Sequence, residues 1–432
     1  MALMVINAGF DGTGTQALAQ ALDQLGLGPC LDLAAFRARA QHLDAWEEAA
    51  NGGAVDWNAV LKKHLPLVDR ITTRDELSDL IGWMVGELSI LHTAVRGGDL
   101  RLGPDDVKVP SLGARLVRDT NAGGYRIDYI YQHDPDYPEE RSPLADPELN
   151  ISAGDVVLSV NGVDALSTEQ FESLLRGQEG RQVLLKVKAG KGGAPRDVIV
   201  VPAGDERNLR YTDWEHTRRL EVEEKSKGQL GYVHLRAMGG GDLTSWYRHF
   251  YPAFDRAGII IDVRHNRGGN IDSFILSKLM RRAWMYWQGR SGEPTWNMQF
   301  APRGHLVVLV DAETASDGEA FADGFRRLGL GKVIGVRTWG GEVWLSDVNR
   351  LTDGGIARAP QTGVYGPEGE WLIEGHGLEP DMVVDNLPHA TFKGQDAQLE
   401  AAIAHLQAEI KKDPRPVPKA PKHPDKSFKY PM

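Results

Sequence analysis

The sequence predicts a multidomain protein of mixed α/β and α+β class, and three observations predict it. First, 432 residues exceed a single domain at about 100–200 residues per domain. Second, short strand-like runs separated by turns fill the stretch from about 110 to 203. Third, strands alternate with helices from about 229 to 410, which favours a mostly parallel sheet with helices on its faces.

The first 54 residues begin with one strand–helix unit. An apolar run at 3–8 leads into a glycine-rich turn at 9–14 and then into leucines at helical spacing. A second helix is expected at 34–50, after which an Asn-Gly-Gly break ends the segment. Residues 1–54 are therefore predicted to be a separate N-terminal segment.

Residues 55–107 are expected to form a helical subdomain. Apolar residues recur at helical spacing until Pro66 interrupts them. Thr73 and Glu76 form a capping box, which predicts the start of a second helix. His92 lies just beyond that helix and before a glycine turn.

Residues 108–203 are expected to form a small β-rich domain. Five runs have strand character and are bounded by turn residues: SLGARLV, YRIDYIY, DVVLSVNGV, VLLKVKA and DVIVVPA. One helix is expected between them, at 167–176.

Residues 204–410 are expected to form the α/β core, followed by an extended tail at 411–432. The apolar runs GYVHL, GIIIDV, HLVVLVD and GKVIGV are typical of strands that are buried on both faces. Helices are expected between them at 242–257, 271–285 and 317–328. The tail is rich in proline and lysine, a composition typical of an extended segment.

The composition argues against several classes of function. The net charge is −11, so no broad basic surface is expected to bind nucleic acid. A single cysteine excludes an internal disulfide and a cysteine-rich zinc module, and neither a metal cluster nor a cofactor is expected. No apolar run is long enough to span a membrane and no secretory signal is evident, so a soluble, cytoplasmic protein is expected.

The strongest local motif is HLVVLVDAETASDGEAFADGF, at 305–325. A buried strand ends at Asp311 and Ser316 opens a helix, so the Ser316 hydroxyl is expected at the carboxyl edge of the sheet. Unsatisfied N–H groups of the first helical turn lie beside it and would stabilise an oxyanion. The motif therefore indicates a nucleophile, whereas the alternative is that Ser316 is only a helix cap.

A second motif, IIIDVRHNRGGNID, ends a buried strand in paired glycines. Gly268 and Gly269 let backbone N–H groups approach a ligand closely, which suits a second oxyanion donor; the alternative is a tight turn without a ligand. Serine acyl transfer also needs a base, normally histidine. His92, His265 and His376 all lie in or beside turns, and these patterns alone do not choose between them.

Four segments in this order, GYVHLRAMGGG, DVRHNRGG, ASDGEAFADGF and WLIEGHGLEPD, resemble the catalytic half of tricorn protease. That family lies within the broad class of tail-specific, or C-terminal processing, serine peptidases. Upstream, VDWNAVLKKHLPLV, TTRDELSDLI and GELSILHTAVRGGD resemble the family's helical subdomain. Residues 108–203 fall where the family carries a PDZ domain, and the resemblance covers about 55–432.

The resemblance implies a serine endopeptidase that cleaves peptides or unfolded proteins through an acyl-enzyme. It assigns roles to six residues: the nucleophile Ser316, the base His92, the distal glutamate Glu374, and the oxyanion donors Asp317 and Gly268 or Gly269. No cofactor is required, and a homo-oligomer is among the expectations.

Two departures from the family pattern shape these expectations. Leu91 stands where the family has a serine that bridges the histidine to the glutamate, which makes a catalytically impaired peptide-binding scaffold the main alternative. The family's preference for basic side chains is attributed to an acid that the stretch 283–290 lacks. Tyr286 and Trp287 are therefore expected to line an aromatic pocket for apolar or uncharged side chains, with core packing as the alternative for Trp287.

The stretch VINAGFDGTGTQALAQALDQLGLGPCLD resembles the opening of a P-loop sulfotransferase. Gly12 stands where that family has an arginine, and Asp11 adds a negative charge beside the phosphate position. Some 50 residues cannot build the full α/β domain that sulfuryl transfer needs. Residues 1–54 are therefore interpreted as a fused fragment or N-terminal cap, with phosphosulfate or nucleotide binding by residues 9–15 as a weaker alternative.

Overall fold

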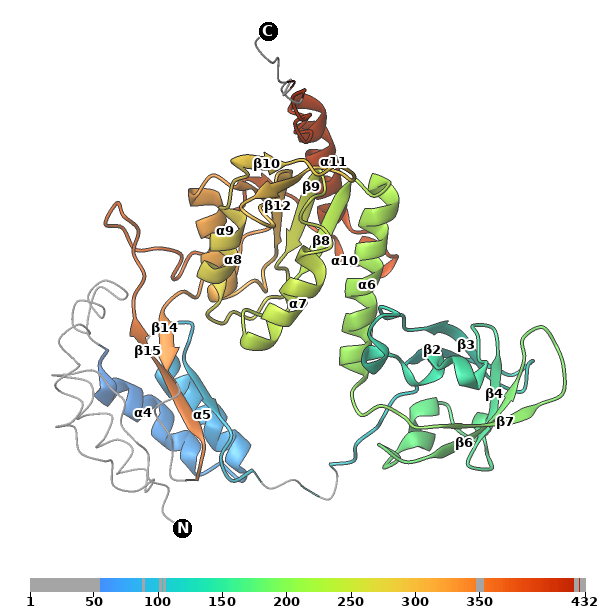
Figure 1. Ribbon diagram of the computed structural model, residues 1–432. Coiled ribbons are helices and arrows are strands. Elements are labelled where there is room, and N and C mark those ends of the chain that lie inside the picture. Colours follow the sequence, from blue (N-terminus) through green and yellow to red (C-terminus); the bar gives the residue numbers. More distant parts are fainter. Residues whose placement is uncertain are drawn as a thin grey trace, which may run out of the picture. The chain divides into compact units, whose positions relative to one another are not determined.

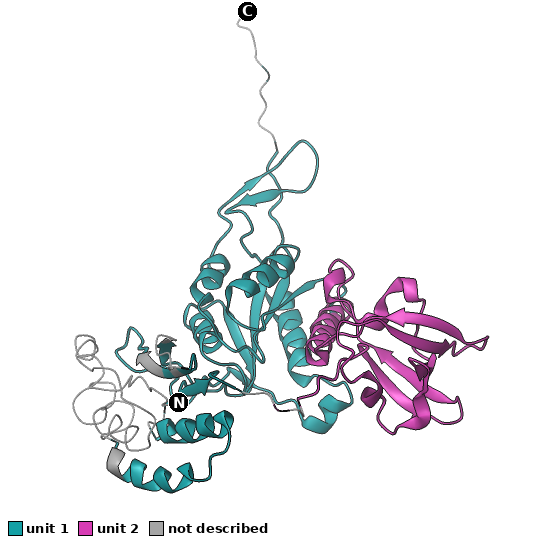
Figure 2. Cartoon of the chain, turned by 90° about the horizontal axis from the view of Figure 1, so that it is seen from below, with its two compact units in different colours: residues 1–101, 226–432 teal, residues 102–225 magenta. Residues whose placement is uncertain are grey.

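The computed structural model describes residues 55–87, 90–100, 103, 106–346, 353–422 and 427. The chain divides into two compact units (Figure 2), one containing residues 1–101 and 226–432 and the other residues 102–225. The fold class predicted from the sequence is confirmed, because one unit carries a parallel α/β sheet and the other an antiparallel β-sheet. The strand, turn and helices expected at 1–54 lie outside the described residues.

The unit of residues 102–225 is built on an antiparallel sheet. Its strands are β2 (Ala114–Asp119), β3 (Gly124–Ile130), β4 (Val156–Val160), β5 (Val163–Asp164), β6 (Val183–Lys188) and β7 (Arg196–Val200). They lie in the order β2-β3-β4-β6-β7, with β5 paired to β4. The alternating pattern of β6 explains this fold, since Val183, Leu185 and Val187 are fully buried while the residues between them face solvent.

Short 3₁₀ helices replace the one α-helix expected in this unit. They are η2 (Pro138–Glu140), η3 (Pro143–Ala145), η4 (Pro147–Leu149), η5 (Ala165–Ser167) and η6 (Phe171–Leu175). The helix expected at 167–176 is reduced to η6. Thr168 Oγ1 accepts from the Gln170 N–H, and such side-chain bonds compete with helical ones at the start of a helix.

Helix α6 (Glu206–Ser226) was not among the expected helices. Its sequence lacks a clear apolar stripe and relies on charged pairs such as Arg210–Glu206 and Lys225–Glu221. Residues 204–225 group with the β-rich unit, so the compact division falls after this helix and not at 203.

The other unit is built on a five-stranded parallel sheet in the order β16-β13-β12-β9-β8. Figure 1 shows its strands β8, β9 and β12 side by side. Its strands are β8 (Leu230–His234), β9 (Gly258–Asp262), β12 (His305–Val310), β13 (Gly331–Gly335) and β16 (Met382–Val383). The register places Asp262 opposite both His234 and Leu309, so the carboxyl ends of β8, β9 and β12 lie at one edge of the sheet.

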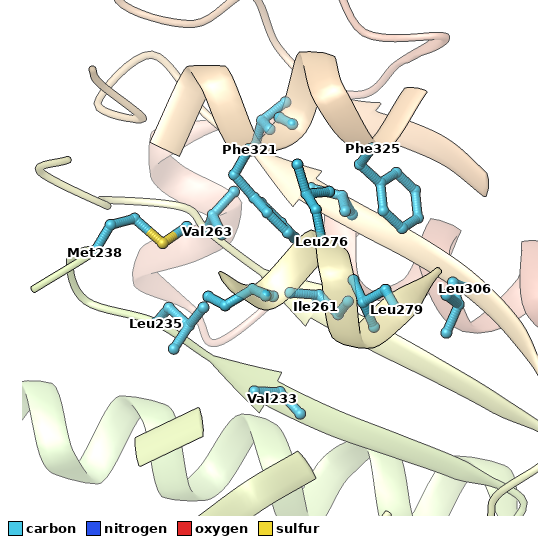
Figure 3. Close-up of a cluster of buried hydrophobic side chains, with 14 of the residues drawn as sticks. Val233, Leu235, Met238, Ile261, Val263, Leu276, Leu279, Leu306, Phe321 and Phe325 are labelled. Carbon is cyan, nitrogen blue, oxygen red and sulfur yellow. The ribbon is translucent and has the colours of Figure 1, made fainter. Parts of the chain in front are cut away.

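Helices cover both faces of this sheet. On one face lie α7 (Gly240–Phe250), α8 (Asp272–Leu279) and α9 (Asp317–Arg327), and on the other lies α11 (Ala397–Lys412). Figure 3 shows Phe321 and Phe325 of α9 and Leu276 of α8 meeting strand residues such as Ile261. Complete burial of these side chains fixes both helices against the sheet and sets the position of the turn before α9.

A helical subdomain precedes the core in sequence. It contains α4 (Trp57–Val68) and α5 (Arg74–Gly86) beside a small sheet of β1 (Ala94–Arg96), β15 (Ile356–Thr362) and β14 (Trp344–Ser346). The Thr73–Glu76 capping box is confirmed. Pro66 does not end α4, because it lies near the carboxyl end, where the helix continues only to Val68.

The remaining elements are β10 (Met285–Trp287), β11 (Thr295–Asn297) and α10 (Pro388–Phe392). The helix expected at 271–285 ends at Leu279, because the chain turns into the β10–β11 hairpin. The helix expected at 242–257 ends at Phe250, where the following turns close back onto β9. Among the described helices, none combines the length and apolar character needed to cross a membrane.

Candidate active site

Ser316 lies in a sharp turn between β12 and α9. It directly precedes the first turn of α9. Its φ of 53° and ψ of −126° are a backbone conformation that residues other than glycine rarely adopt. Such a residue costs on the order of 1–3 kcal/mol and persists only where its surroundings hold it. The turn follows the carboxyl end of β12, as the sequence predicted, and the strain is consistent with a constrained functional residue.

Glu319 holds this turn in place. Its carboxylate is fully buried and accepts hydrogen bonds from the backbone N–H of Ser316 at 3.0 Å, of Gly340 at 2.7 Å and of Gly341 at 3.0 Å. Burial raises the pKa of Glu319, while these hydrogen bonds and one from Thr338 oppose the rise. Glu319 thus ties the loop at 338–341 to the nucleophile turn.

Gly268 lies directly against Ser316. At φ 80°, a Cβ on Gly268 would lie 2.5 Å from the Ser316 Cβ and 3.0 Å from its Oγ, so only glycine allows this approach. Gly269 is equally confined, because a Cβ there would lie 1.9 Å from the Met238 carbonyl oxygen. The structure therefore brings the glycine pair and Ser316 together.

The backbone donors beside Ser316 differ in availability. The Gly268 N–H donates to Asn266 Oδ1 at 2.9 Å and is already engaged. Within the described ranges, neither the Gly269 N–H nor the Asp317 N–H donates a hydrogen bond. Of the three expected oxyanion donors, the latter two are the ones with a free N–H.

The Asp317 side chain has a separate structural role. Its Oδ2 accepts from the N–H of Ile271 at 2.7 Å and of Asp272 at 3.1 Å, which joins the starts of α8 and α9. Burial, and after it the charge of Asp272, raises the pKa of Asp317 to about 7. No local pattern around Asp317 indicates this role.

His92 lies beside the loop that Glu319 anchors. Its ring meets the ring of Trp339 edge-on at a centroid distance of 5.2 Å. The backbone N–H of Trp339 donates to the Thr314 carbonyl oxygen at 3.0 Å. Trp339 therefore connects the imidazole to the turn that carries Ser316. In the part of the chain that the structure describes, His92 Nδ1 is buried without a hydrogen-bond partner, and no bond joins His92 to Ser316 Oγ.

The electrostatic environment favours a neutral His92. Burial lowers its pKa, and the charge of Glu374 opposes this effect. Arg358 lowers the pKa further, while the Val343 backbone raises it. A neutral imidazole is the form that can accept a proton from a serine.

Glu374 holds the segments on either side of this histidine. Its Oε1 accepts from the Leu91 N–H at 3.3 Å, and its Oε2 accepts from the N–H groups of Glu342 at 2.7 Å and Val343 at 2.9 Å. Glu374 thus contacts residue 91 through the backbone, so a leucine side chain is compatible with the contact.

Ser89 and Thr93, two hydroxyl residues close to Leu91 in sequence, could replace the missing relay serine. The Thr93 hydroxyl donates to Ile90 O at 3.3 Å and is therefore engaged away from this contact. Ser89 lies outside the described residues.

Tyr286 and Trp287 lie away from Ser316. Both belong to the β10–β11 hairpin, where the Tyr286 hydroxyl accepts from Arg303 Nε at 3.1 Å. Tyr286 lines a pocket of about 470 Å³ together with Leu306, at the amino end of β12. Ser316 follows the carboxyl end of this six-residue strand, so a single chain does not bring these aromatic side chains to the nucleophile.

Sequence reasoning missed two residues that organise the site. Glu319 stands three residues after Ser316, the serine–x–x–glutamate spacing of a capping box, so a signal for it was present. Trp339 offered no local signal, because its contact with His92 joins segments more than 200 residues apart. No group of metal-ligating side chains occurs among the residues that the structure places.

Three regions of the chain match known families. Residues 229–384 match peptidase family S41, residues 111–205 match the tricorn protease PDZ domain, and residues 49–86 match the tricorn protease C1 domain. These regions cover the parallel core, the antiparallel sheet and helices α4 and α5, and they confirm the resemblance inferred from the sequence.

Individual relatives give the same result. The chain is 36% identical over 375 residues to tricorn protease homolog 1 of Streptomyces coelicolor, covering 86% of this chain and 34% of that protein. It is 37% identical over 351 residues to a putative tricorn-like protease C-terminal subunit of Sulfurisphaera tokodaii, covering 81% of this chain and 40% of that protein. The chain therefore spans only about a third to two-fifths of these relatives' length.

A solved structure is also similar. The crystal structure of the tricorn protease matches with a TM-score of 0.75 at 28% identity, covering 86% of this chain and 36% of that one. The similarity thus extends over most of the fold described above.

Proposed function

Because this chain carries a region of peptidase family S41 beside tricorn protease C1 and PDZ regions, we propose that it is a serine peptidase that cleaves peptides. The observation that carries the proposal is the strained Ser316 turn with Gly268 packed against its side chain. A helix cap alone needs neither the unusual φ nor a glycine against the hydroxyl.

The proposed reaction uses Ser316 as nucleophile and His92 as base. His92 takes the hydroxyl proton as Ser316 Oγ attacks the scissile carbonyl, and the N–H groups of Gly269 and Asp317 stabilise the oxyanion. His92 then protonates the leaving amine, and water releases the acyl group. The scheme requires His92 to form a hydrogen bond to Ser316 when substrate is bound, and catalytic hydrogen bonds often tighten only in the substrate complex.

Glu374 completes the proposed relay from a distance. Its charge favours the imidazolium that forms during the reaction, in line with its effect on the pKa of His92. It also fixes the backbone at Leu91, directly before the base. Leu91 is therefore compatible with catalysis, which disfavours the alternative of an impaired peptide-binding scaffold.

A fluorophosphonate probe tests the proposal. We expect the wild-type chain to be labelled and to hydrolyse peptides, and both activities to be lost in Ser316→Ala and reduced in His92→Ala. Ser273→Ala is the matched control, because Ser273 is an exposed serine at the start of α8. Labelling that persists in Ser316→Ala would refute the nucleophile assignment, and a wild-type chain that neither labels nor hydrolyses peptides would refute the enzyme.

The proposed partners are peptides and unfolded proteins, including peptides whose C-termini bind the PDZ region. In that region the Gly113 N–H donates to Ser111 Oγ at 3.0 Å, which orders the turn SLGA at 111–114 that we propose binds the peptide carboxylate. Assembly of several copies and a cytoplasmic location remain predictions. Light scattering of the purified chain tests the first.

A further inference from the structure

His265 links the two turns that form the candidate site. Its Nδ1 lies 3.0 Å from Asp311 Oδ2 and 3.0 Å from Glu313 Oε2, and its backbone N–H donates to Asp311 Oδ1 at 3.0 Å. The histidine belongs to the turn that leads to Gly268, and both carboxylates belong to the turn that leads to Ser316. One side chain therefore spans the gap between these turns.

Asp311 transmits this contact to the nucleophile turn. Its Oδ1 also accepts from the N–H groups of Glu313 at 3.0 Å and Thr314 at 2.9 Å, so it sets the backbone just before Ser316. Asn266, the residue after His265, accepts a hydrogen bond at its carbonyl oxygen from the Ala315 N–H at 2.9 Å. The cross-link thus continues directly into Ser316 on one side and the glycine pair on the other.

The backbone of His265 is itself constrained. Its φ is 60°, in the left-handed region that histidine enters more readily than most residues but still at a cost. Its side chain is 41% exposed, so burial of apolar surface does not explain the strain. The three contacts to Asp311 and Glu313 are what hold it there.

We propose that His265 is a positioning residue whose protonated form holds the glycine turn against the nucleophile turn. The inference rests on the proposed function, in which Gly269 and Ser316 act together. Both carboxylates share the single Nδ1–H of His265. An imidazolium adds a positive charge that compensates both of them, whereas a neutral ring keeps at most the shared, weaker N–H bond. Loss of the proton should therefore loosen the cross-link without unfolding the chain.

The charges around His265 favour the protonated form. The hydrogen bond with Asp311 raises the pKa of His265, and Glu313 adds to the rise, while burial opposes both. The other titratable neighbours are Arg264, which is cationic and pairs with Asp262, and His234 of β8, whose pKa burial lowers to about 4 so that it is neutral. Because the pKa is raised, the protonated cross-link is complete below the ordinary histidine pKa and is lost as the pH rises through the folded pKa.

The pH profile of kcat/KM tests the proposal with two variants. In the wild type we expect a fall on the alkaline side, about three- to tenfold, as His265 loses its proton. His265→Asn tolerates the positive φ but carries no charge, so its profile should lack this fall and stay about tenfold below the wild-type maximum, mainly through kcat. Glu313→Gln removes one of the two carboxylates, so it should move the fall to lower pH.

His389→Asn is the matched control, because His389 is an exposed histidine on α10 far along the sequence from both turns. Its profile should equal that of the wild type. If His265→Asn and Glu313→Gln leave the alkaline side unchanged, the proposal is wrong. If His265→Asn lowers the free energy of unfolding while kcat stays unchanged, His265 is only structural and the proposal is also wrong.

A second measurement separates this proposal from the peptidase assignment. NMR titration of the His265 ring, assigned by its absence in His265→Asn, should give a pKa above the ordinary histidine value, and Glu313→Gln should lower it. The amide signals of Gly268 and Gly269 should shift over the same pH range. If the Gly268 and Gly269 amide signals do not shift as His265 titrates, the positioning role is wrong even in a fully active enzyme. If these signals shift with His265 but the chain hydrolyses no peptide, only the peptidase assignment is wrong.

Discussion

Substitution of Gly268 by alanine gives the sharpest test of how backbone geometry supports the candidate site. The added Cβ would lie 2.5 Å from the Ser316 Cβ, 3.0 Å from its Oγ and 3.1 Å from the Ala315 carbonyl oxygen. Non-bonded carbon atoms prefer separations of about 3.5–4.0 Å. Ser316 or the glycine turn must therefore move by roughly 1 Å.

The expected effect on catalysis follows from this displacement. A misplacement of about 1 Å at a reacting group can cost about 100-fold in rate. The Ser316 backbone cannot easily absorb the shift, because its N–H is held by Glu319 at 3.0 Å. We therefore expect kcat/KM for peptide hydrolysis, and the rate of fluorophosphonate labelling, to fall about 100-fold.

The φ of 80° adds a cost that is unrelated to the clash. An alanine in the left-handed region destabilises by about 1–2 kcal/mol. Gly329→Ala is the matched control, since Gly329 has a φ of 66° and no atom within 4 Å of the added Cβ. Both variants should lose stability in urea unfolding because of the positive φ, Gly268→Ala more so because of its clash, but only Gly268→Ala should lose labelling. Equal activity of the two variants would refute the argument that Gly268 must approach Ser316.

Three further predictions concern titratable groups near the site. Burial, and after it the charge of Glu319, raises the pKa of Glu342 to about 9, so the folded chain holds this acid neutral at pH 7 while the unfolded chain ionises it. Glu342→Gln should therefore raise the free energy of unfolding at pH 7, by up to about 3 kcal/mol, and not at pH 4; destabilisation at pH 7 would contradict this. Because burial lowers the pKa of His92, kcat/KM should rise with pH along a limb centred below 6.5. Glu374→Gln removes a charge that raises the pKa of His92, so it should shift this limb to lower pH. A shift to higher pH would show that Glu374 does not act on His92. Glu319→Gln leaves one amide oxygen to accept from the four donors that now bond to the carboxylate. Labelling of Ser316 should therefore slow about tenfold, with the same pH dependence as the wild type. An unchanged rate would show that the Ser316 turn keeps its shape without the Glu319 carboxylate.

Much of the fold could be predicted because it depends on local pattern. The four apolar runs became the parallel strands β8, β9, β12 and β13, since side chains buried on both faces leave a nearly continuous apolar signature. The capping box at Thr73 appeared as expected, because its hydrogen bonds join residues three apart. Helix α6 was missed for the converse reason, since its charged surface carries no apolar stripe.

The candidate site could be predicted only in part. The motif spacing placed Ser316 at the end of β12 and identified Gly268 as a residue of close approach, because both properties follow from a strand ending in a turn. The resemblance to tricorn protease then added His92 and Glu374, which no local pattern had distinguished from other histidines and acids. Tyr286 and Trp287 were expected in the substrate pocket from the resemblance, because they stand in the stretch that matches the family's specificity position. Both belong to the β10–β11 hairpin, and Tyr286 lies beside Leu306 at the amino end of β12.

The sequence by itself therefore determined the strands, the glycine turns and the serine that begins α9, because these are set by neighbours along the chain. Only the tertiary structure decided which groups meet across long separations. It placed Trp339 between His92 and the nucleophile turn, Glu374 against the backbone of Leu91, and His265 between two carboxylates of another turn. These contacts depend on the register and packing of the parallel sheet, which bring distant loops to one edge and which no local pattern encodes.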